Sequence, residues 1–317
     1  LPKNKRKKAN YQDVFSTCMV KLGQRNEKVV AITAAMPDGT GLKRFKNIYP
    51  ERFFDVGIAE ETAVALASGI AANGGKPVYG VYSSFIQRTF DQISQDLCID
   101  KNPATIVIFA GSVYGMNDVT HLGLQDMPML GNIPNLVYLA PTTKEEYLAM
   151  LDWSVEQTEY PVAIKLPGGA MISDGKEVKK DFRRLDQYEV TRKGSKVAVI
   201  GLGTFYGLAG QAADLIGEKT GTVPTVINPY YITGLDEELL KELKKDHDIV
   251  VTLEDGILNG GFGEKIARFY GDSDMKVLNY GLKKEFIDRY DVKEILLENH
   301  LTAEQIADDV MQVEQKR

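Results

Sequence analysis

Three short segments of the chain place acidic, cationic, aromatic and imidazole side chains in loops that follow apolar runs. In the first, Glu60 and Glu61 follow the run FDVGIA and open an alanine-rich stretch. Carboxylates in the first turn of a helix interact favourably with its positive end, which is the ordinary role for such a pair. Ligands, however, bind at the carboxyl ends of strands in open parallel sheets, and burial behind an apolar helix favours a protonated carboxyl. Glu60 is therefore a candidate for acid–base chemistry.

The second segment, YSSFIQRTFDQ, runs from Tyr82 to Gln92. Its aromatic residues Tyr82 and Phe85 are of the kind that fill a core, so packing is their ordinary role. Arg88 lies among these aromatics at an expected strand-to-helix loop, and a guanidinium suits anion binding because its planar donors match carboxylate and phosphate oxygens. We therefore expect Arg88 to face a ligand.

The third segment, GMNDVTH, runs from Gly115 to His121 and holds one of only three histidines in the chain. It follows an expected strand at 104–109. An imidazole in such a loop is suited to proton transfer or to hydrogen bonding with a hydroxylated substrate, although an inert histidine is the alternative.

The elements that must position these segments follow a β-α alternation, which predicts parallel sheets covered by helices on both faces. Strands are expected at 28–33, 53–56, 77–81, 104–109, 136–140 and 162–166, and helices at 10–25, 60–72 and 88–98. The helix at 60–72 is apolar on nearly every face, which predicts burial or a subunit interface.

At Gly168-Gly169 the alternation of apolar runs ends, and a polar, charged stretch follows at 172–190. This change in composition predicts a domain boundary. A second βα alternation follows it, through 196–201, 225–227, 237–245, 249–253, 264–270 and 275–278. We therefore expect two doubly wound α/β domains, a first with a mostly parallel sheet at 10–180 and a smaller second at 190–317, preceded by a basic linker or tail at 1–9.

The overall composition excludes several classes of protein. The 317 residues are enough for two α/β domains, and a net charge of -6 gives no basic character suited to nucleic acid. No run of about 18 apolar residues predicts a membrane-spanning helix. Cys18 and Cys98 are too few for a disulfide framework, so a cytoplasmic location is expected. The basic start at Leu1, without an initiator methionine, suggests a piece of a longer protein or a processed or engineered start.

Taken together, these motifs resemble those of the transketolase family of thiamine-diphosphate-dependent enzymes, and most of all the 1-deoxy-D-xylulose-5-phosphate synthase branch. The similarity runs from about residue 10 to 312, in one order. It is carried by ITAAMPDGTGL (32–42), RFFDVGIAEE (52–61), YSSFIQRTFDQ (82–92), Thr120-His121 followed by a glycine, and LEDGILNGGFGEKIARF (253–269).

The resemblance implies a pyrimidine-binding domain followed by a transketolase C-terminal domain. It implies that thiamine diphosphate is the cofactor and that Mg²⁺ and the diphosphate bind a separate N-terminal domain, whose Gly-Asp-Gly signature this sequence lacks. The expected partners are therefore an N-terminal transketolase-like domain or subunit, a second copy through the pyrimidine domain, and a small sugar or 2-oxoacid substrate, with no nucleic acid and no membrane.

The resemblance also implies roles for individual residues. Glu60 would hydrogen-bond a ring nitrogen of the aminopyrimidine and favour the imino tautomer that activates the cofactor, while Phe85 would stack on the ring. The implied sites are catalytic residues Glu60 and His121, cofactor-binding residues Glu60, Phe85 and Tyr82, and substrate-side residues Arg88, His121, Asn117 and Lys165.

Several positions depart from the synthase pattern. Ala110 and Gly168 stand where the synthase has arginines that would grip a substrate phosphate, and such contacts are charge-assisted and often bidentate. Asn117-Asp118 replaces an Asp-Gly pair, and Thr62 replaces a histidine. Lys165 could supply one positive charge but not the guanidinium geometry. We therefore expect a transferase acting on carbon–carbon bonds of ketoses, with an altered acceptor-phosphate site.

Other functions remain open from sequence. The segment GLGTFYG (201–207) has the spacing GxGxxxG rather than that of a dinucleotide fingerprint, and the next strand ends without a ribose-binding acid. Gly260-Gly261-Phe262-Gly263 could cradle an anion at a helix N-terminus or simply allow close packing at the helix entry. The beta subunit of a 2-oxoacid dehydrogenase and a non-catalytic partner subunit are the remaining alternatives.

Overall fold

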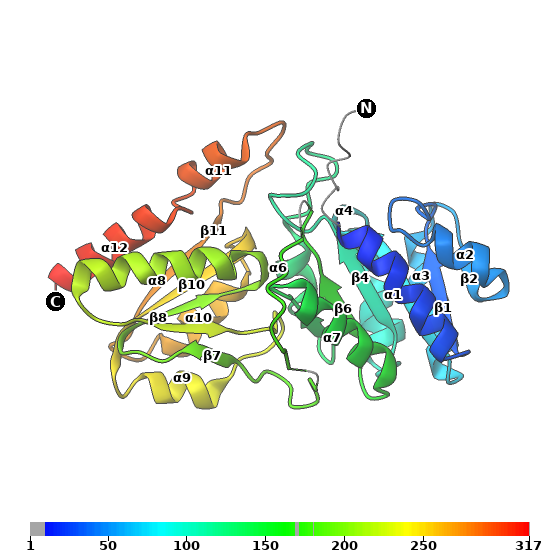
Figure 1. The fold of residues 1–317 in the computed structure, drawn as a ribbon, viewed down its shortest axis with the longest axis horizontal. Helices are drawn as coiled ribbons and strands as arrows, with labels where there is room; N and C mark the ends of the chain where they lie inside the picture. The colour runs from blue at the N-terminus through cyan, green and yellow to red at the C-terminus, as the bar shows by residue number, and fades with distance from the viewer. Residues whose placement is uncertain (1–9, 169–170, 180, 317) are drawn as a thin grey trace.

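A computed structural model describes residues 10–168, 171–179 and 181–316. Within it the chain forms two α/β lobes that lie side by side, each built on its own sheet (Figure 1). This architecture confirms the expected fold class. The expected tail at 1–9, Gly169 and residue 180 lie outside the described residues, and the expected domain boundaries stay a prediction.

The first sheet has six strands in the order β2-β1-β3-β4-β6-β5, and every neighbouring pair is parallel. Its strands are β1 (Val29–Thr33), β2 (Phe53–Asp55), β3 (Lys76–Tyr82), β4 (Thr105–Phe109), β5 (Val137–Leu139) and β6 (Val162–Lys165). Ile106 and Ile108 of β4 pack into one apolar core, whereas Val107 and Phe109 pack into another. Both faces are therefore buried, which explains why these strands read as continuous apolar runs.

Helices cover both faces of this sheet. They are α1 (Tyr11–Arg25), α2 (Lys43–Ile48), α3 (Glu60–Ala72), α6 (Asp126–Leu130) and α7 (Lys144–Glu156), with a short turn η1 (Pro50–Arg52) before β2. Asn10 and Thr143 cap α1 and α7 by accepting hydrogen bonds from backbone N–H groups of the first turn. Within the chain only one side of α3 is buried and its small residues on the other side are exposed, so the alternative of a subunit interface stays a prediction.

The expected single helix at 88–98 is also wrong in detail. The helical path begins earlier and is broken into α4 (Ser83–Ile86), η2 (Gln87–Thr89), α5 (Phe90–Gln92) and the π-helical turn η3 (Ile93–Cys98). The Thr89 hydroxyl donates to the Ile86 carbonyl at 2.8 Å and so competes with the regular helical ladder. Phe85 and Arg88 both lie on this broken helical stretch.

The second sheet has the order β11-β10-β8-β9-β7. Its strands are β7 (Glu189–Arg192), β8 (Lys196–Gly201), β9 (Thr225–Asn228), β10 (His247–Ile257) and β11 (Lys276–Leu282), and its helical elements are η4 (Gly203–Phe205), α8 (Tyr206–Thr220), α9 (Glu237–Leu243), α10 (Phe262–Tyr270), α11 (Val292–Glu298) and α12 (Ala303–Gln315). The edge strand β7 is antiparallel to β9 and was not expected, because its residues are exposed and lack an apolar pattern. Strand β10 runs four residues past the expected end at Leu253, through an irregular register against β11.

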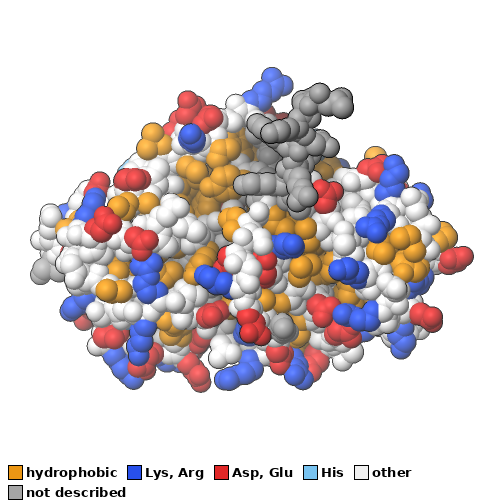
Figure 2. Space-filling model, viewed as in Figure 1, with side chains coloured by type: hydrophobic (Ala, Val, Ile, Leu, Met, Phe, Trp, Pro, Cys, Tyr) orange, Lys and Arg blue, Asp and Glu red, His pale blue; other side chains and the backbone are white. Residues whose placement is uncertain are grey.

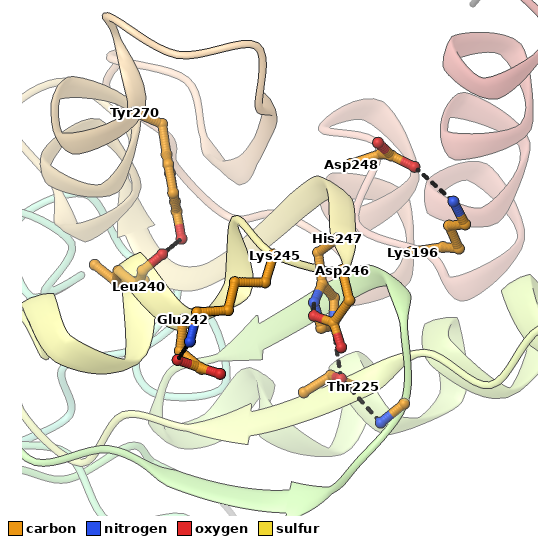
Figure 3. A network of polar contacts seen from close by, with 10 residues as sticks. Lys196, Thr225, Leu240, Glu242, Lys245, Asp246, His247, Asp248 and Tyr270 are labelled. Carbon is orange, nitrogen blue, oxygen red and sulfur yellow. Dashed lines mark hydrogen bonds and ion pairs between the residues drawn. The ribbon is translucent and has the colours of Figure 1, made fainter.

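A polar network ties together the first residues of β9 and β10 (Figure 3). His247 Nε2 lies 2.8 Å from the Thr225 hydroxyl, which also accepts the Gly194 N–H, and His247 Nδ1 lies 2.6 Å from Asp246. A carboxylate, an imidazole and a hydroxyl hydrogen-bonded in this order also occur in the catalytic triads of hydrolases. Thr225 is only 2% exposed, however, so a substrate cannot reach its hydroxyl, and the network is structural.

The two lobes share one continuous apolar core, which includes Ile133 of the first and Phe262 of the second. Backbone hydrogen bonds join β5 to the segment after β9, from Ala140 to Tyr230 and from Ile232 to Tyr138. The buried carboxylate of Glu146 also crosses this interface by accepting from the Asn228 amide at 2.9 Å. These contacts make the lobes a packed pair rather than two loosely linked domains.

Lysine and arginine side chains are interspersed with acidic ones over the face shown in Figure 2. None of the described helices combines the length and the apolar character needed to cross a membrane. Cys18 and Cys98 are both free thiols.

Glu146 predicts a pH dependence of stability. Burial, with a smaller contribution from the negative charge of Glu189, raises its pKa from 4.5 to about 7. Because the folded-state pKa lies above the unfolded one, the stabilisation is complete below pH 4.5 and is lost as pH rises through about 7. The loss amounts to about 3 kcal/mol. The Glu146→Gln variant should lack this component.

Urea unfolding at pH 5 and pH 8 measures the effect. From pH 5 to pH 8 the unmodified chain should lose free energy of unfolding that the Glu146→Gln variant does not lose. The difference in stability between the variant and the unmodified chain should therefore change in favour of the variant as pH rises. Glu159→Gln removes an exposed carboxylate of the same lobe and should show no such change. An identical pH dependence in Glu146→Gln and the unmodified chain would contradict the assignment.

Candidate functional site

The candidate site lies at one edge of the first sheet, where the parallel strands β2, β3 and β4 end. Glu60 follows β2, the aromatic and cationic segment follows β3, and the loop with His121 follows β4. Parallel strands present their carboxyl ends at the same edge, which is where open α/β sheets bind ligands. The topology therefore brings together three segments that are far apart in the sequence.

Glu60 is held at the start of α3 by the turn before it. The Asp55 carboxylate at the end of β2 accepts the N–H groups of Ala35 and Gly57, and Gly57 adopts the left-handed conformation that this turn requires. Glu60 is only 2% exposed, and its Oε1 accepts a hydrogen bond from Arg88 at 2.7 Å. Its other oxygen, Oε2, is buried and has no partner among the described residues.

The aromatic residues form a connected cluster beside this ion pair. The Tyr82 and Phe85 rings are stacked, with centroids 5.9 Å apart and an interplanar angle of 18°. The Arg88 guanidinium lies 5.8 Å from the Phe85 centroid, and the His121 imidazole makes a T-shaped contact with the same ring, with centroids 5.5 Å apart. The structure thus brings together Glu60, Tyr82, Phe85, Arg88 and His121, as predicted from the sequence.

The orientation of His121 is set within its own loop. Its Nδ1 lies 2.8 Å from the Asp118 carboxylate, and the Thr120 hydroxyl donates to the same carboxylate at 2.6 Å. Hydrogen bonds from Thr120 and then from His121 lower the pKa of Asp118. A carboxylate at Nδ1 favours a proton on that nitrogen and leaves Nε2 for exchange with a ligand, as in other acid–base histidines. Sequence reasoning treated Asp118 only as a departure from the family pattern and missed this role.

Asn117 and Lys165 are not part of this cluster. Asn117 lies exposed on the same loop as His121, with its backbone carbonyl bound to the Arg289 N–H at 2.6 Å. Lys165 is buried, and its ammonium lies 2.8 Å from both carboxylate oxygens of Asp126, which also accepts the Tyr138 hydroxyl. Its charge is therefore already used in a buried ion pair beneath the site.

The glycine-rich turn before α10 is a structural feature rather than an anion cradle. The Phe262 and Gly263 N–H groups donate to the Glu254 carboxylate at 2.7 and 2.8 Å, so the chain's own carboxylate takes the place of an anion. Burial raises the pKa of Glu254 to about 7. A side chain at Gly261 would collide with Glu254, since a Cβ there would lie 2.3 Å from its Oε2. The packing alternative explains these glycines.

The Glu60–Arg88 pair predicts a coupled effect on stability. Replacing Arg88 by alanine removes the one hydrogen bond that the structure records for a buried carboxylate, which should cost about 1–3 kcal/mol of free energy of unfolding. In a Glu60→Gln background the cost should be smaller, because a neutral amide does not need the cation. Urea unfolding of the two single variants and the double variant measures this coupling.

The control for this cycle is Arg44→Ala, which removes an exposed arginine of the same lobe and should cost the same in both backgrounds. Equal costs of Arg88→Ala with Glu60 and with Gln at position 60 would mean that the ion pair contributes nothing to stability.

The sequence matches two family models in tandem. Residues 7–171 match the transketolase pyrimidine-binding domain, and residues 186–306 match the transketolase C-terminal domain. Among curated proteins, the chain is 40% identical to 1-deoxy-D-xylulose-5-phosphate synthase of Clostridium beijerinckii and 38% identical to that of Caldanaerobacter subterraneus subsp. tengcongensis. Each alignment covers 96% of this chain but 49% of the relative, so the chain spans about half the length of these relatives.

Solved structures give the same result. A protein described as a split gene transketolase, inactive beta4 tetramer, superposes with a TM-score of 0.81 at 25% identity, covering 96% of this chain and 98% of that one. Transketolase from Campylobacter jejuni shares the fold with a TM-score of 0.79 at 15% identity, over 98% of this chain and 48% of that one. The resemblance seen in the motifs is thereby confirmed, and the chain belongs to the transketolase family, of which it carries the pyrimidine-binding and C-terminal domains.

Proposed function

We propose that this chain is the pyrimidine-binding half of a thiamine-diphosphate-dependent transferase that makes or breaks a carbon–carbon bond next to the carbonyl of a ketose. The observation that carries the proposal is the Glu60 carboxyl, buried at the ligand-binding edge of the sheet with one oxygen lacking a partner. Buried polar atoms without a partner are rare in folded proteins and call for an explanation. A ring nitrogen of the cofactor's pyrimidine would be the missing partner.

The neighbouring side chains fit a flat aminopyrimidine. Phe85 would stack on the ring, with Tyr82 stacked behind it, and an aromatic pair of this kind contributes about 0.5–1.5 kcal/mol beyond area burial. When bound, thiamine diphosphate supplies the carbon nucleophile. Glu60 would hold a proton at its Oε2 toward the pyrimidine, while Arg88 keeps the other oxygen in place. His121, oriented through Nδ1 by Asp118, would exchange a proton with a substrate oxygen at Nε2.

The diphosphate and Mg²⁺ would bind a partner domain or subunit of the N-terminal transketolase type. Among the described residues, no cluster of three or more histidine, cysteine, aspartate or glutamate side chains is placed to hold a metal ion. The chain's likeness over nearly full length to a split-gene protein supports a partner of this kind. The exposed side of α3, together with Phe54 and Ile58 beside it, would take part in self-association.

The acceptor site would differ from that of the synthase relatives. Ala110 is buried and has a positive φ, and a Cβ added at Gly168 would lie 2.2 Å from the Gly115 Cα. A side chain at Gly168 would therefore require the His121 loop to move, and Ala110 offers no charge to a phosphate. Lys165 cannot supply that charge while it pairs with Asp126. The proposed acceptor is therefore an aldehyde other than a small phosphorylated aldose.

The cofactor assignment predicts binding that depends on a partner. Isothermal titration of thiamine diphosphate with Mg²⁺ into this chain mixed with the polypeptide encoded immediately upstream should show saturable binding. The chain alone should show little, because the diphosphate would lack its ligands. A mixture that fails to bind, although the two polypeptides associate, would remove the cofactor assignment.

The role of Glu60 predicts a loss of turnover. In the reconstituted enzyme, with pyruvate as donor and phosphorylated or unphosphorylated aldoses as acceptors, Glu60→Gln should lower kcat about 10²–10⁴-fold, because it removes a proton-holding group. Glu61→Gln changes the exposed neighbouring carboxylate and should leave kcat unchanged. Turnover that is indifferent to Glu60→Gln and Glu60→Ala would show that the catalytic role is wrong.

A further inference from the structure

The loop at residues 110–125, called the His121 loop below, joins β4 to α6 and contains no helix or strand. It carries Asn117, Asp118 and His121, and it begins at Ala110 in a left-handed conformation. A loop of this length without regular structure must be held by contacts from outside it if His121 is to keep one orientation. The residues that hold it come mainly from the second lobe.

The base of the loop is anchored by Asp255, a buried residue near the end of β10. Its carboxylate accepts the Ser112 hydroxyl at 2.5 Å and the Val113 N–H at 3.1 Å, and both groups are themselves buried. The extension of β10 beyond Leu253 is what carries Asp255 to this position. Because the contact is buried and charge-assisted, it is stronger than a neutral surface hydrogen bond.

The crest of the loop is anchored by the segment that connects β11 to α11. Asp288 Oδ1 accepts the Val119 N–H at 3.0 Å, and the Arg289 N–H donates to the Asn117 carbonyl. The Tyr290 hydroxyl donates to the Val113 carbonyl at 2.7 Å. These bonds fix the backbone on both sides of Asp118, whose carboxylate orients His121.

At its far end the loop is held again by the second lobe, where the Ile257 N–H donates to the Leu124 carbonyl at 3.2 Å. The second lobe thus binds the loop at its start, its middle and its end. Among the described residues, it contributes no side chain to the cluster around Glu60. The rest of the first lobe contributes the Phe85 ring, which makes a T-shaped contact with the imidazole, and the Leu166 carbonyl, which accepts the Gly111 N–H at 3.0 Å.

We propose that the second lobe serves as the scaffold of the His121 loop, with Asp255 and Asp288 acting as positioning residues for His121. Asp255 fixes where the loop leaves the sheet, and Asp288 fixes the turn in which Asp118 meets the imidazole. The importance of this positioning for turnover rests on the proposed function, whereas the positioning itself is a property of the chain.

The test uses NMR of the whole chain labelled with ¹³C at histidine Cε1. The chain has only three histidines, so the His121 signal is identified by its loss in His121→Gln. Asp288→Ala should shift or broaden the His121 signal, while the signals of His247 and His300 stay unchanged. Asp288→Asn keeps an acceptor oxygen for Val119 and should restore the original signal.

Lys284→Ala is the matched control, because it removes an exposed side chain of the same connecting segment. Asp255→Asn should perturb the same His121 signal from the base of the loop. Since Asp255 is buried and its variant could lose stability, the exposed Asp288 decides the outcome. An unchanged His121 signal in Asp288→Ala would overturn the proposal.

A second readout uses the enzyme reconstituted with its partner. Asp288→Ala should lower kcat/KM about 10- to 100-fold and displace the pH profile of kcat, with recovery in Asp288→Asn. If the reconstituted mixture has no thiamine-dependent activity, the proposed function fails while the NMR result stands. If activity is present and its pH profile is unmoved in Asp288→Ala, the positioning role fails while the proposed function stands.

Discussion

The parallel direction of β2, β3 and β4 is the constraint on which the candidate site depends. Because these parallel strands all end at one edge of the first sheet, Glu60, the Tyr82–Arg88 segment and the His121 loop meet there without any of them being adjacent in sequence. A sheet buried on both faces holds this edge rigidly, since its alternate side chains pack into separate apolar cores. The site is thus a consequence of the fold, with short loops deciding its chemistry.

At this edge of the sheet the buried Glu60 carboxyl is only partly hydrogen-bonded. Glu60 has one oxygen paired with Arg88 and one without a partner, and a half-satisfied buried carboxyl is costly in the free chain. An unpaired buried polar group of this kind is typical of ligand-binding sites. By contrast, other buried charged groups of the chain have partners: Lys165 pairs with Asp126, and Glu254 accepts from the turn before α10. The difference separates the group available for chemistry from those that hold the structure.

The second lobe is joined to the first too closely to be an independent appendage. A shared apolar core, backbone bonds to β5 and the buried Glu146–Asn228 contact fix the relative position of the lobes. That fixed position is what allows Asp255 and Asp288 to reach the His121 loop. A change in the second lobe can therefore alter a site to which it contributes no side chain of its own.

The sequence by itself determined the two-domain α/β class and most strand positions, because apolar periodicity is a local signal. It also singled out Glu60, Tyr82, Phe85, Arg88 and His121, which the fold brings together and whose roles stay predictions. It failed where long-range contacts decide the outcome. The broken helix after Ser83 and the edge strand β7 carry no distinct pattern, and the pairing of Lys165 with Asp126 joins positions far apart in the chain. Only the tertiary structure could place Asp255 and Asp288 against the His121 loop, because the packing of one lobe on the other brings those backbone and carboxylate groups into contact.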